Sequence, residues 1–306
     1  MKARILQILR DEAETVSGEA LSELLGISRV SVWKHMRKLQ EAGYHIEAGS
    51  TGYRLKSAPD IPYPWEFPER EGLVHHFDAV DSTMDIAREL ARDDCPPFTV
   101  VIAERQRKGR GRLRRSWHSE DGGLYFTVVL RPDLPPALCT RVIFTASVEL
   151  CRTLEHRCGM APKVKWPNDI LVEDRKICGM LSEMEAEADR VSYLNIGIGL
   201  NVNNDPSPPE ADATSLRLLL GRAVDRKALL AEFLNRFETC LGDAPSSEVM
   251  EAWKRRSGTL NRPVRVVTRD TVYEGLAVDI DDDGALRLRM PDGTEQRVIH
   301  GDCFHN

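Results

Sequence analysis

A proline-rich segment near residue 60 divides the chain and limits what it can fold into. The stretch APDIPYPWEFPE, residues 58–69, holds prolines 59, 62, 64 and 68, and this spacing favours a stiff, extended linker over a helix or a central strand. At 306 residues the chain is also long for a single domain. We therefore expect four parts: an N-terminal domain at 1–57, a linker at 58–72, a central domain at 73–257 and a C-terminal domain at 258–306.

The first part has the pattern of a winged helix-turn-helix. Apolar residues at 5, 6, 8 and 9 mark one face of a first helix, and Glu19–Leu25 is a second helical candidate that stops at Gly26. Ser28 is a suitable N-cap for a third helix, Arg29–Ala42. The run Tyr44–Leu55, with a tight turn at 49–52, predicts the β-wing.

The charge of the third helix favours DNA as the partner of this domain. Residues 1–57 hold nine Lys/Arg against seven Asp/Glu, but the third helix holds four basic residues against Glu41 alone. Such an excess can supply the phosphate contacts on which most DNA affinity depends. A dimerisation or protein-docking module with a solvated basic face stays open as an alternative. The residues expected to contact DNA are Arg29, Ser31, Lys34, Arg37 and Lys38.

A basic loop between two strand-like runs is the first sign of a ligand site. Phe98–Glu104 and Leu124–Leu130 are apolar enough for buried strands, and residues 105–115 between them hold seven Lys/Arg and two glycines. Glycines among cations let the backbone bend closely around an anion. An RNA-binding tract, a disordered loop and a solvated turn are the alternatives. A loop between core strands favours a phosphorylated ligand.

Three further stretches could contribute to that site. In Lys163–Leu181, a bend at 167–169 and a hairpin turn at 173–176 would hold Lys165, Asp169 and Lys176 on one β platform. In Asn195–Asn201, glycines 197 and 199 allow another backbone or a ligand to approach closely. In Asp81–Asp85, Ser82 and Asp85 have the spacing of a helix capping box. Turn and cap roles alone would also explain most of these residues.

The composition and the C-terminal pattern complete the picture. Short β-runs at 263–267, 272–280, 285–290 and 296–300, separated by turns with Asp-Gly pairs, predict a small β-barrel. A net charge of −6 requires any nucleic-acid surface to be local. Seven scattered cysteines without a C-x-x-C pair are typical of buried thiols in a reducing compartment. With no signal-peptide pattern and no long apolar run, we expect a cytoplasmic protein without membrane contact.

Taken together, these stretches resemble the biotin–protein ligase family. The matches cover most of residues 74–203 in family order, and Lys165-Trp166-Pro167-Asn168-Asp169 is the most specific. They are Asp81-Ser82-Thr83, the loop ending in Gly109-Arg110-Gly111-Arg112, Lys165–Asp169, Arg175-Lys176 with Gly179, and Gly197-Ile-Gly-Leu-Asn201. The N-terminal helices with Gly52-Tyr53-Arg54-Leu55 resemble the bifunctional class, the biotin operon repressors. The resemblance implies an α+β multidomain fold: a winged helix-turn-helix, a mixed α/β domain similar to class II synthetases, and an SH3-like small β-barrel.

The resemblance also implies a two-step reaction and a set of site residues. Biotin and ATP would give biotinyl-5′-AMP, and a lysine of a biotin acceptor domain, such as biotin carboxyl carrier protein, would then take the biotin. Arg112 and Lys176 would be catalytic, and Asp169 and Asn201 would lie on the ATP–Mg²⁺ side, without a metal site made by protein alone. Contacts to biotin and its adenylate would come from Ser82, Thr83, Gln106, Gly109, Arg110, Gly111, Arg112, Trp117, Lys176 and Gly179. Operator DNA and, with adenylate bound, a second copy of the chain are the other expected partners.

The sequence departs from the family pattern in three places. Met84 stands where the family usually has Asn, Ser50-Thr51 replaces a usual Gly-Lys of the wing, and the sequence after Gly301-Asp302 diverges. Two other readings of the central domain stay open: a lipoate or octanoate ligase, and a biotin-sensing repressor that does not ligate. The pair Arg112 and Lys176 favours ligation, because sensing alone would not require two phosphate-neutralising cations.

Overall fold

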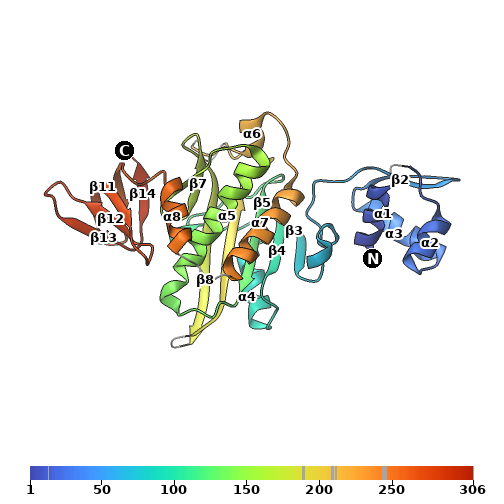
Figure 1. The fold of residues 1–306 in the computed structure, drawn as a ribbon, viewed down its shortest axis with the longest axis horizontal. Helices are drawn as coiled ribbons and strands as arrows, with labels where there is room; N and C mark the ends of the chain where they lie inside the picture. The colour runs from blue at the N-terminus through green and yellow to red at the C-terminus, as the bar shows by residue number, and fades with distance from the viewer. Residues whose placement is uncertain (13, 188–189, 208–209, 211, 243–246, 306) are drawn as a thin grey trace. The chain divides into compact units, whose positions relative to one another are not determined.

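A computed structural model describes residues 1–306 apart from 13, 188–189, 208–209, 211, 243–246 and 306. The chain forms two compact units, residues 1–74 and 75–306 (Figure 1). The boundary falls at the first residue of strand β3 (Val74–Val80). Each unit is described by itself.

The first unit is a winged helix-turn-helix, as the sequence predicts. Ser17 and Ser28 accept hydrogen bonds from the backbone N–H groups of Ala20 and Ser31 and so cap the second and third helices. Gly26 ends the second helix at φ 66°, a left-handed conformation that glycine adopts without strain. The elements are α1 (Lys2–Asp11), α2 (Gly18–Leu25), α3 (Arg29–Glu41), β1 (His45–Gly49) and β2 (Gly52–Ser57).

The proline-rich segment belongs to this unit and is not an extended spacer. It forms two short 3₁₀ helices, η1 (Pro64–Glu66) and η2 (Pro68–Arg70), each beginning with a proline, whose missing N–H costs nothing at that position. Tyr63 and Trp65 stack with ring centroids 4.5 Å apart and pack against the buried core of the helices. Trp65 also donates a hydrogen bond of 3.0 Å to the Tyr44 hydroxyl. The aromatic residues between the prolines thus attach the segment to the helical module.

The second unit is built on a seven-stranded sheet in the order β3-β4-β5-β9-β8-β7-β6. The expected strand Leu124–Leu130 is found with those bounds. Residues 175 and 176, expected in a turn, lie inside strand β8, because the turn between β7 and β8 needs only Glu173 and Asp174, both at positive φ. The other strands are β4 (Thr99–Gln106), β5 (Leu124–Leu130), β6 (Lys163–Lys165), β7 (Asp169–Val172), β8 (Arg175–Glu187) and β9 (Arg190–Leu200).

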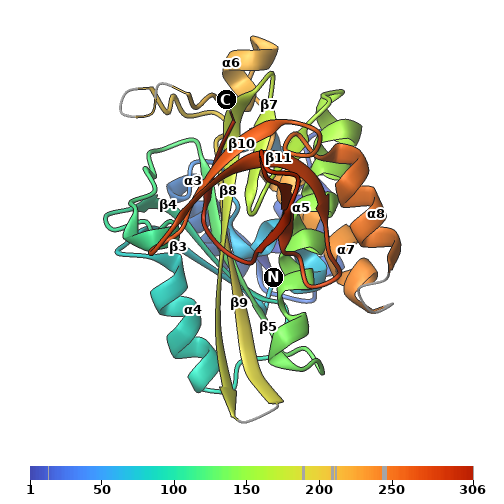
Figure 2. The same ribbon diagram turned by 90° about the vertical axis from the view of Figure 1, so that its left-hand side faces the viewer.

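Helices cover both faces of this sheet (Figure 2). On one face, Ala87 and Ala91 of α4 pack against Val101, Val129 and Tyr193 of the sheet. On the opposite face lie α5, α7 and α8; there the rings of Phe126 and Phe233 meet edge to face. The helices are α4 (Thr83–Arg92), η3 (Arg112–Arg114), η4 (Pro136–Leu138), α5 (Thr140–Cys158), α6 (Leu216–Leu220), α7 (Arg226–Gly242) and α8 (Ser247–Arg256).

The C-terminal part of this unit is a five-stranded antiparallel sheet in the order β13-β12-β11-β10-β14. Its fifth strand, β14, was not expected from the sequence, because it spans only four residues. It pairs with β10, where Cys303 lies opposite Val266. Trp166 of the Lys-Trp-Pro-Asn-Asp motif is buried and donates a 2.9 Å hydrogen bond to the Gly284 carbonyl. The strands are β10 (Pro263–Val267), β11 (Val272–Ile280), β12 (Leu286–Arg289), β13 (Glu295–Val298) and β14 (Asp302–His305).

Candidate functional site

The second unit contains a cavity of about 270 Å³ that brings together most of the residues singled out in the sequence. Nine of the expected site residues line it, from the N-terminus of α4, the basic loop and strands β7 and β8. They are Ser82, Thr83, Gln106, Arg110, Gly111, Arg112, Trp117, Lys176 and Gly179; Asp169, expected on the ATP side, lines it too. The cavity has a neutral end and a charged end, and the two differ in chemistry.

The neutral end is a chain of hydrogen bonds around Gln106. The Gln106 carbonyl oxygen accepts from the Thr83 backbone N–H at 2.8 Å and from the Thr83 hydroxyl at 3.1 Å. Its amide nitrogen donates to Ser119 Oγ at 2.9 Å, and the Thr127 hydroxyl donates to Thr83 Oγ1 at 2.9 Å. Ser82 caps α4 by accepting from the Met84 N–H at 3.3 Å, not from Asp85. These side chains therefore form a rigid polar wall suited to an uncharged ligand group with donors and acceptors.

The basic loop folds as a small hairpin over the cavity. The Gly111 N–H donates to the Arg115 carbonyl at 2.7 Å and the Trp117 N–H to the Gly109 carbonyl at 2.8 Å. Gly109 does not line the cavity, but a Cβ there would lie 2.4 Å from the Trp117 carbonyl oxygen and 2.9 Å from Ser119 Oγ. Only glycine lets the two sides of the hairpin come this close.

Trp117 extends from this hairpin onto the sheet. A Cβ at Gly199 would lie 2.4 Å from two atoms of the indole, and one at Gly179 would lie 2.9 Å from it. Both glycines therefore make room for the ring, which explains the glycines of β8 and β9 in this place. The indole Nε1 is buried and has no hydrogen-bond partner among the described residues. The Lys176 ammonium lies 5.2 Å from the ring centroid, within cation–π range.

The charged end is formed by Lys176 and Arg112. Lys176 Nζ lies 3.0 Å from Asp169 Oδ1 on the neighbouring strand. Arg112 donates to the Asn168 side-chain carbonyl at 3.4 Å and to the Gly301 backbone carbonyl at 3.2 Å, both uncharged acceptors. Burial lowers the pKa of Arg112, although the nearby carboxylates of Asp302 and Asp169 act in the opposite direction. The Arg112 guanidinium is therefore a charge held without a direct carboxylate partner among the described residues, and it can meet an anionic ligand.

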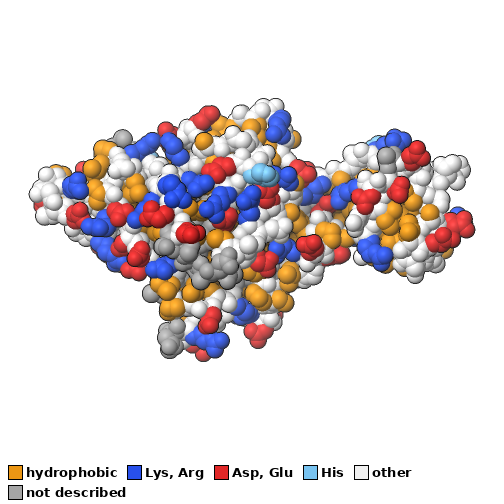
Figure 3. All heavy atoms as spheres, viewed as in Figure 1, with side chains coloured by type: hydrophobic (Ala, Val, Ile, Leu, Met, Phe, Trp, Pro, Cys, Tyr) orange, Lys and Arg blue, Asp and Glu red, His pale blue; other side chains and the backbone are white. Residues whose placement is uncertain are grey.

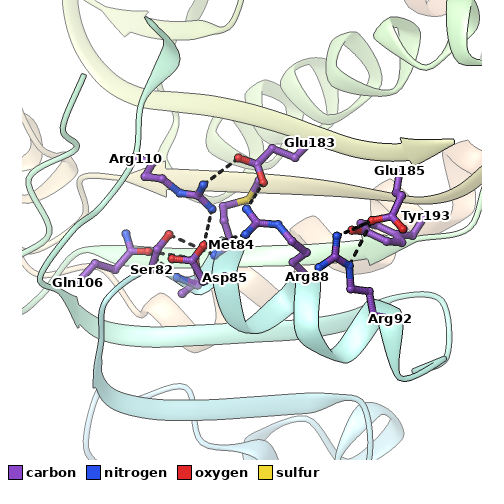
Figure 4. Close-up of polar contacts among 11 residues, drawn as sticks. Ser82, Met84, Asp85, Arg88, Arg92, Gln106, Arg110, Glu183, Glu185 and Tyr193 are labelled. Atoms are coloured by element: carbon purple, nitrogen blue, oxygen red, sulfur yellow. Dashed lines mark hydrogen bonds and ion pairs between the residues drawn. The ribbon is translucent and has the colours of Figure 1, made fainter. Parts of the chain in front are cut away.

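Arg110 lies in a different environment from Arg112. Its guanidinium pairs with Asp85 Oδ1 and Glu183 Oε1, each at 3.0 Å (Figure 4). The resemblance implied that Arg110, like Arg112, contacts biotin or its adenylate. In the structure, however, two carboxylates already neutralise Arg110, and its side chain points toward α4 and β8. The loop thus directs two arginines, two residues apart, to different partners.

Asn201, like Gly109, is an expected site residue that does not line the cavity. Its side-chain carbonyl accepts a 3.0 Å hydrogen bond from Asn204 Nδ2, and its backbone N–H donates to the Ile177 carbonyl at 2.8 Å. It lies at the buried end of β9 as a structural link between β8 and the following loop. In the residues that the structure describes, no group of three or more His, Cys, Asp or Glu side chains could hold a metal ion.

Sequence reasoning missed several residues of the lining. Asn168 belongs to a quoted motif but had no assigned role, and Asp302 was noted only for its position after Gly301. Arg115 pairs with Asp302 and so connects the basic loop with β14. That pairing joins residues far apart in the sequence, and no local pattern signals it. The lining residues without an expected ligand role are Arg115, Ser116, Asn168, Met180, Leu181, Ile198, Glu210 and Asp302, whereas Met84, Gly197 and Gly199, which also line the cavity, had been singled out in the sequence.

The first unit offers a separate candidate surface on α3. Val32, Met36 and Leu39 are buried, so the opposite face of the helix meets solvent. All five residues expected at DNA lie on α3: four have exposed side chains, and Ser31 is half-buried, within 3.0 Å of the Ser28 hydroxyl. Two apolar residues share the solvent face: Val30 is 63% exposed and Trp33 is 53% exposed. Hydrophobic side chains reach the surface over the helices of this unit (Figure 3).

A groove lies between this face and the wing. It is lined by Val30, Trp33 and the wing residues 48–53, and it measures about 490 Å³. The Arg37 guanidinium lies 5.9 Å from the Trp33 ring centroid. Apolar groups flanked by cations are the composition of a base-reading surface, in which cations meet phosphates and methyl or ring groups meet base edges.

No helix in the described part of the chain is both long and apolar enough to cross a membrane.

Comparison with known protein families gives three matches that follow one another along the chain. Residues 76–203 match the model of the biotin/lipoate A/B protein ligase family. Residues 259–306 match the biotin protein ligase C-terminal domain, and residues 2–54 match a helix-turn-helix domain. All three parts therefore have counterparts in known families.

Individual relatives agree with these matches. The bifunctional ligase/repressor BirA of Bacillus subtilis is 36% identical over 304 residues, which cover 92% of each chain. The protein of the same description from Escherichia coli is 28% identical over 90% of this chain and 88% of its own. Among solved structures, a biotin protein ligase from Aquifex aeolicus in complex with biotin and ATP superposes with a TM-score of 0.65, at 27% identity over 76% of this chain and 98% of that one.

Proposed function

This chain belongs to the biotin protein ligase family, among its bifunctional ligase/repressors, and we propose that it attaches biotin to an acceptor lysine through biotinyl-5′-AMP. The observation that carries this proposal is the two-ended cavity. Its neutral end, around Gln106, suits the uncharged ureido ring of biotin, and its cationic end, with Arg112 and Lys176, suits a carboxylate beside a phosphate chain. Of the parts assigned from the sequence, residues 73–257 serve as the proposed catalytic domain and residues 258–306 as the C-terminal domain, while the proline-rich segment belongs with the helix-turn-helix unit.

The first step joins two anions, and this is where the cations act. The biotin carboxylate oxygen bonds to the α-phosphorus of ATP while the bond from that phosphorus to the bridging oxygen breaks, and pyrophosphate leaves. Lys176 would lie between the carboxylate and the α-phosphate, and Arg112 beside the phosphates. Cations fixed in place before the reaction stabilise the charge that develops in the transition state without reorganising at that moment.

The second step uses the mixed anhydride. The neutral amine of the acceptor lysine attacks the biotinyl carbonyl carbon, the carbon–oxygen bond to AMP breaks, and AMP leaves with the electron pair. A mixed anhydride also reacts with water. The hairpin of the basic loop, with Trp117 beneath it, would exclude water while the acceptor is absent.

Magnesium would enter with ATP. The phosphates would supply most of its ligands, as is usual for Mg²⁺ in nucleotide sites. Asp169 is the carboxylate placed to meet the ion, because it lines the cavity beside Lys176. Asn201 is the second residue that we assign to the ATP–Mg²⁺ side; it lies outside the cavity lining, and its backbone N–H donates to the carbonyl of Ile177, the residue after Lys176. Mg²⁺ would neutralise the pyrophosphate that leaves in the first step.

Biotin-dependent exchange of labelled pyrophosphate into ATP tests the proposal, with lipoate and octanoate as competing acids. We expect exchange with biotin and not with lipoate or octanoate. No acceptor domain is needed, because the reversible first step requires only biotin and ATP. Exchange with lipoate or octanoate instead would identify a ligase of the related acids. Tight biotin binding without any exchange would identify a biotin-sensing repressor, so each alternative has its own outcome.

The proposed second function is repression of biotin-synthesis genes through the helix-turn-helix unit. Arg29, Lys34, Arg37 and Lys38 would contact phosphates, with Ser31 at a polar base edge. We place Val30 and Trp33 in the major groove as well, because residues near the N-terminus of a recognition helix reach the base edges.

Trp33→Ala is therefore expected to weaken specific DNA binding by about tenfold, the effect of losing one good base contact. Lys34→Ala is expected to weaken binding to all sequences and to reduce the slope of log affinity against log salt by about 1. Fluorescence anisotropy on duplex DNA from upstream of the biotin-synthesis genes, with a scrambled duplex beside it, measures both.

Leu24→Ala is the matched control, since Leu24 is 59% exposed but lies on α2. An equal loss in Leu24→Ala and Trp33→Ala would contradict base reading by α3. DNA affinity that does not change with salt concentration, in the wild-type protein and in every variant, would favour a protein-docking module instead.

The remaining partners and the location complete the proposal. The acceptor is a biotin carboxyl carrier domain, and the repressing species is a homodimer that forms through the central sheet when adenylate is bound. Sedimentation that is the same with and without biotin and ATP would contradict the dimer. The cytoplasm is the proposed location, because the seven cysteines are free thiols in the structure and such thiols persist in a reducing compartment.

A further inference from the structure

Four side chains form a closed ring of ion pairs at the edge of the cavity. Arg110 comes from the basic loop, Asp85 and Arg88 from the first turns of α4, and Glu183 from β8 (Figure 4). Arg110 contacts Asp85 Oδ1 and Glu183 Oε1, each at 3.0 Å. Arg88 contacts Glu183 Oε2 at 2.7 Å and Asp85 Oδ1 at 3.2 Å. Each guanidinium therefore meets both carboxylates, and we call these four residues the ion-pair ring.

The ring is held by two rigid elements. Asp85 and Arg88 are three residues apart on α4 and so lie on one face of the helix. Glu183 pairs in register with Asn195 in the central sheet, opposite that face. The hydrogen bond to Glu183 raises the pKa of Arg88. Only Arg110 belongs to a loop, and the ring therefore attaches the loop to the sheet and to the helix together.

The charges of the ring are balanced, and this determines what each member does. Two cations and two anions cancel, and all four side chains are 31% to 42% exposed. Removing Glu183 would leave the two arginines sharing one carboxylate and repelling each other. Removing Arg88 would leave Arg110 with both carboxylates. The two substitutions should therefore act in opposite directions on the hold over Arg110.

We propose that Asp85 and Glu183 are positioning residues that lock Arg110, with Arg88 bound to the same two carboxylates, so that the basic loop stays closed over the biotin end of the cavity and retains the acyl-adenylate. Arg110 acts in this way as an anchor, while Arg112 meets the phosphates. The identity of the retained ligand rests on the proposed function. The lock itself does not depend on that identity, because each contact of the ring joins two side chains of this chain.

The test compares two glutamates of one strand. Glu183→Gln removes a member of the ring, and Glu185→Gln is the matched control. Glu185 lies two residues along β8 and pairs with Arg92 and Tyr193, outside the ring (Figure 4). Limited trypsin digestion of the full-length protein without added ligand measures how often the loop opens. Cleavage sites in residues 105–115 are located by mass spectrometry. We expect loop cleavage to be about two- to fivefold faster in Glu183→Gln than in Glu185→Gln, the effect of losing partly exposed ion pairs.

Substitutions of Asp85 and Arg88 should change the rate of loop cleavage in different ways. Asp85→Asn should also speed loop cleavage, whereas Arg88→Gln should leave it at or below the wild-type rate. Faster cleavage in all three variants would mean general loosening and would overturn the lock, as would equal rates in Glu183→Gln and Glu185→Gln. If Glu183→Gln does not fold, as judged by its thermal unfolding, Asp85→Asn decides the question alone.

A second measurement connects the lock to the ligand. Dissociation of biotinyl-5′-AMP, measured by tryptophan fluorescence, should be about two- to fivefold faster in Glu183→Gln and unchanged in Glu185→Gln. Unchanged dissociation together with faster loop cleavage would overturn the retention role. If the wild-type protein binds no biotin or adenylate at all, the proposed function fails, and the digestion experiment still decides whether the ring locks the loop.

Discussion

Lys176→Ala will reduce biotin-dependent pyrophosphate exchange by about 10²–10³-fold, the range found when one preorganised donor is removed from a developing negative charge. The ammonium group is the cation of β8 in the cavity, 3.0 Å from Asp169 and 5.2 Å from the Trp117 ring. Its loss leaves the biotin carboxylate and the α-phosphate without the charge between them. It also leaves Asp169 as an additional negative charge at the same place, which opposes the approach of both substrates.

The fold of this variant should be intact, because the contacts that keep residue 176 in place belong to the backbone. Its N–H donates to the Asp212 carbonyl and its carbonyl accepts from the Thr214 N–H, each at 2.9 Å. Lys163→Ala is the control, since Lys163 is an exposed lysine of β6 in the same sheet and outside the cavity lining. Isothermal titration with biotin alone separates binding from chemistry. Wild-type exchange in Lys176→Ala would rule out the charge role.

Arg112→Gly will release biotinyl-5′-AMP about 10- to 100-fold faster, the effect expected from the loss of a charge-assisted hydrogen bond to the ligand. The guanidinium of this half-buried residue donates to Asn168 and to the Gly301 carbonyl, both uncharged, which leaves its charge available to the phosphate. Adenylate that leaves the cavity reacts with any exposed lysine. We therefore expect biotin to appear on bystander proteins, measured by streptavidin blotting of a mixture of the acceptor domain and serum albumin.

Leu113→Gly is the matched control for the flexibility that glycine introduces. Leu113 is 57% exposed and has φ 52°, so glycine fits there without strain and the guanidinium stays. If both variants label albumin equally, loop flexibility and not the charge of Arg112 retains the adenylate. If Arg112→Gly labels only the acceptor, the assigned role is wrong.

The two arginines of the loop show how far sequence reasoning reaches. The motif Gly109–Arg112 predicted a ligand site at the loop, and both of its arginines line the cavity. The motif could not tell their roles apart. Arg110 meets Glu183, and Arg112 meets Gly301, across 73 and 189 positions of the chain. Ion pairs depend on distance in space, and nothing in the spacing of the loop residues encodes the partners.

The secondary-structure elements that were expected depend on neighbouring residues, and those that were missed depend on tertiary contacts. Leu124–Leu130, Pro263–Val267 and Val272–Ile280 were expected with the bounds that the structure has, because apolar alternation and turn residues act between near neighbours. Strand β14 was missed because its four residues have too short a pattern and depend on pairing with β10. The folded proline segment was missed because its contacts, such as Trp65 with Tyr44, are tertiary.

By itself, then, the sequence determined the winged helix-turn-helix, most of the strands and the stretches that would form the site. Each of these depends on side-chain periodicity, capping or turn chemistry within a few residues. Only the tertiary structure decided that Asn201 lies outside the cavity, that Trp166 contacts Gly284 of the C-terminal part, and that Arg110 pairs with Asp85 and Glu183. These outcomes follow from sheet register and helix packing, which bring distant residues within 3 to 4 Å, the range over which hydrogen bonds and ion pairs act.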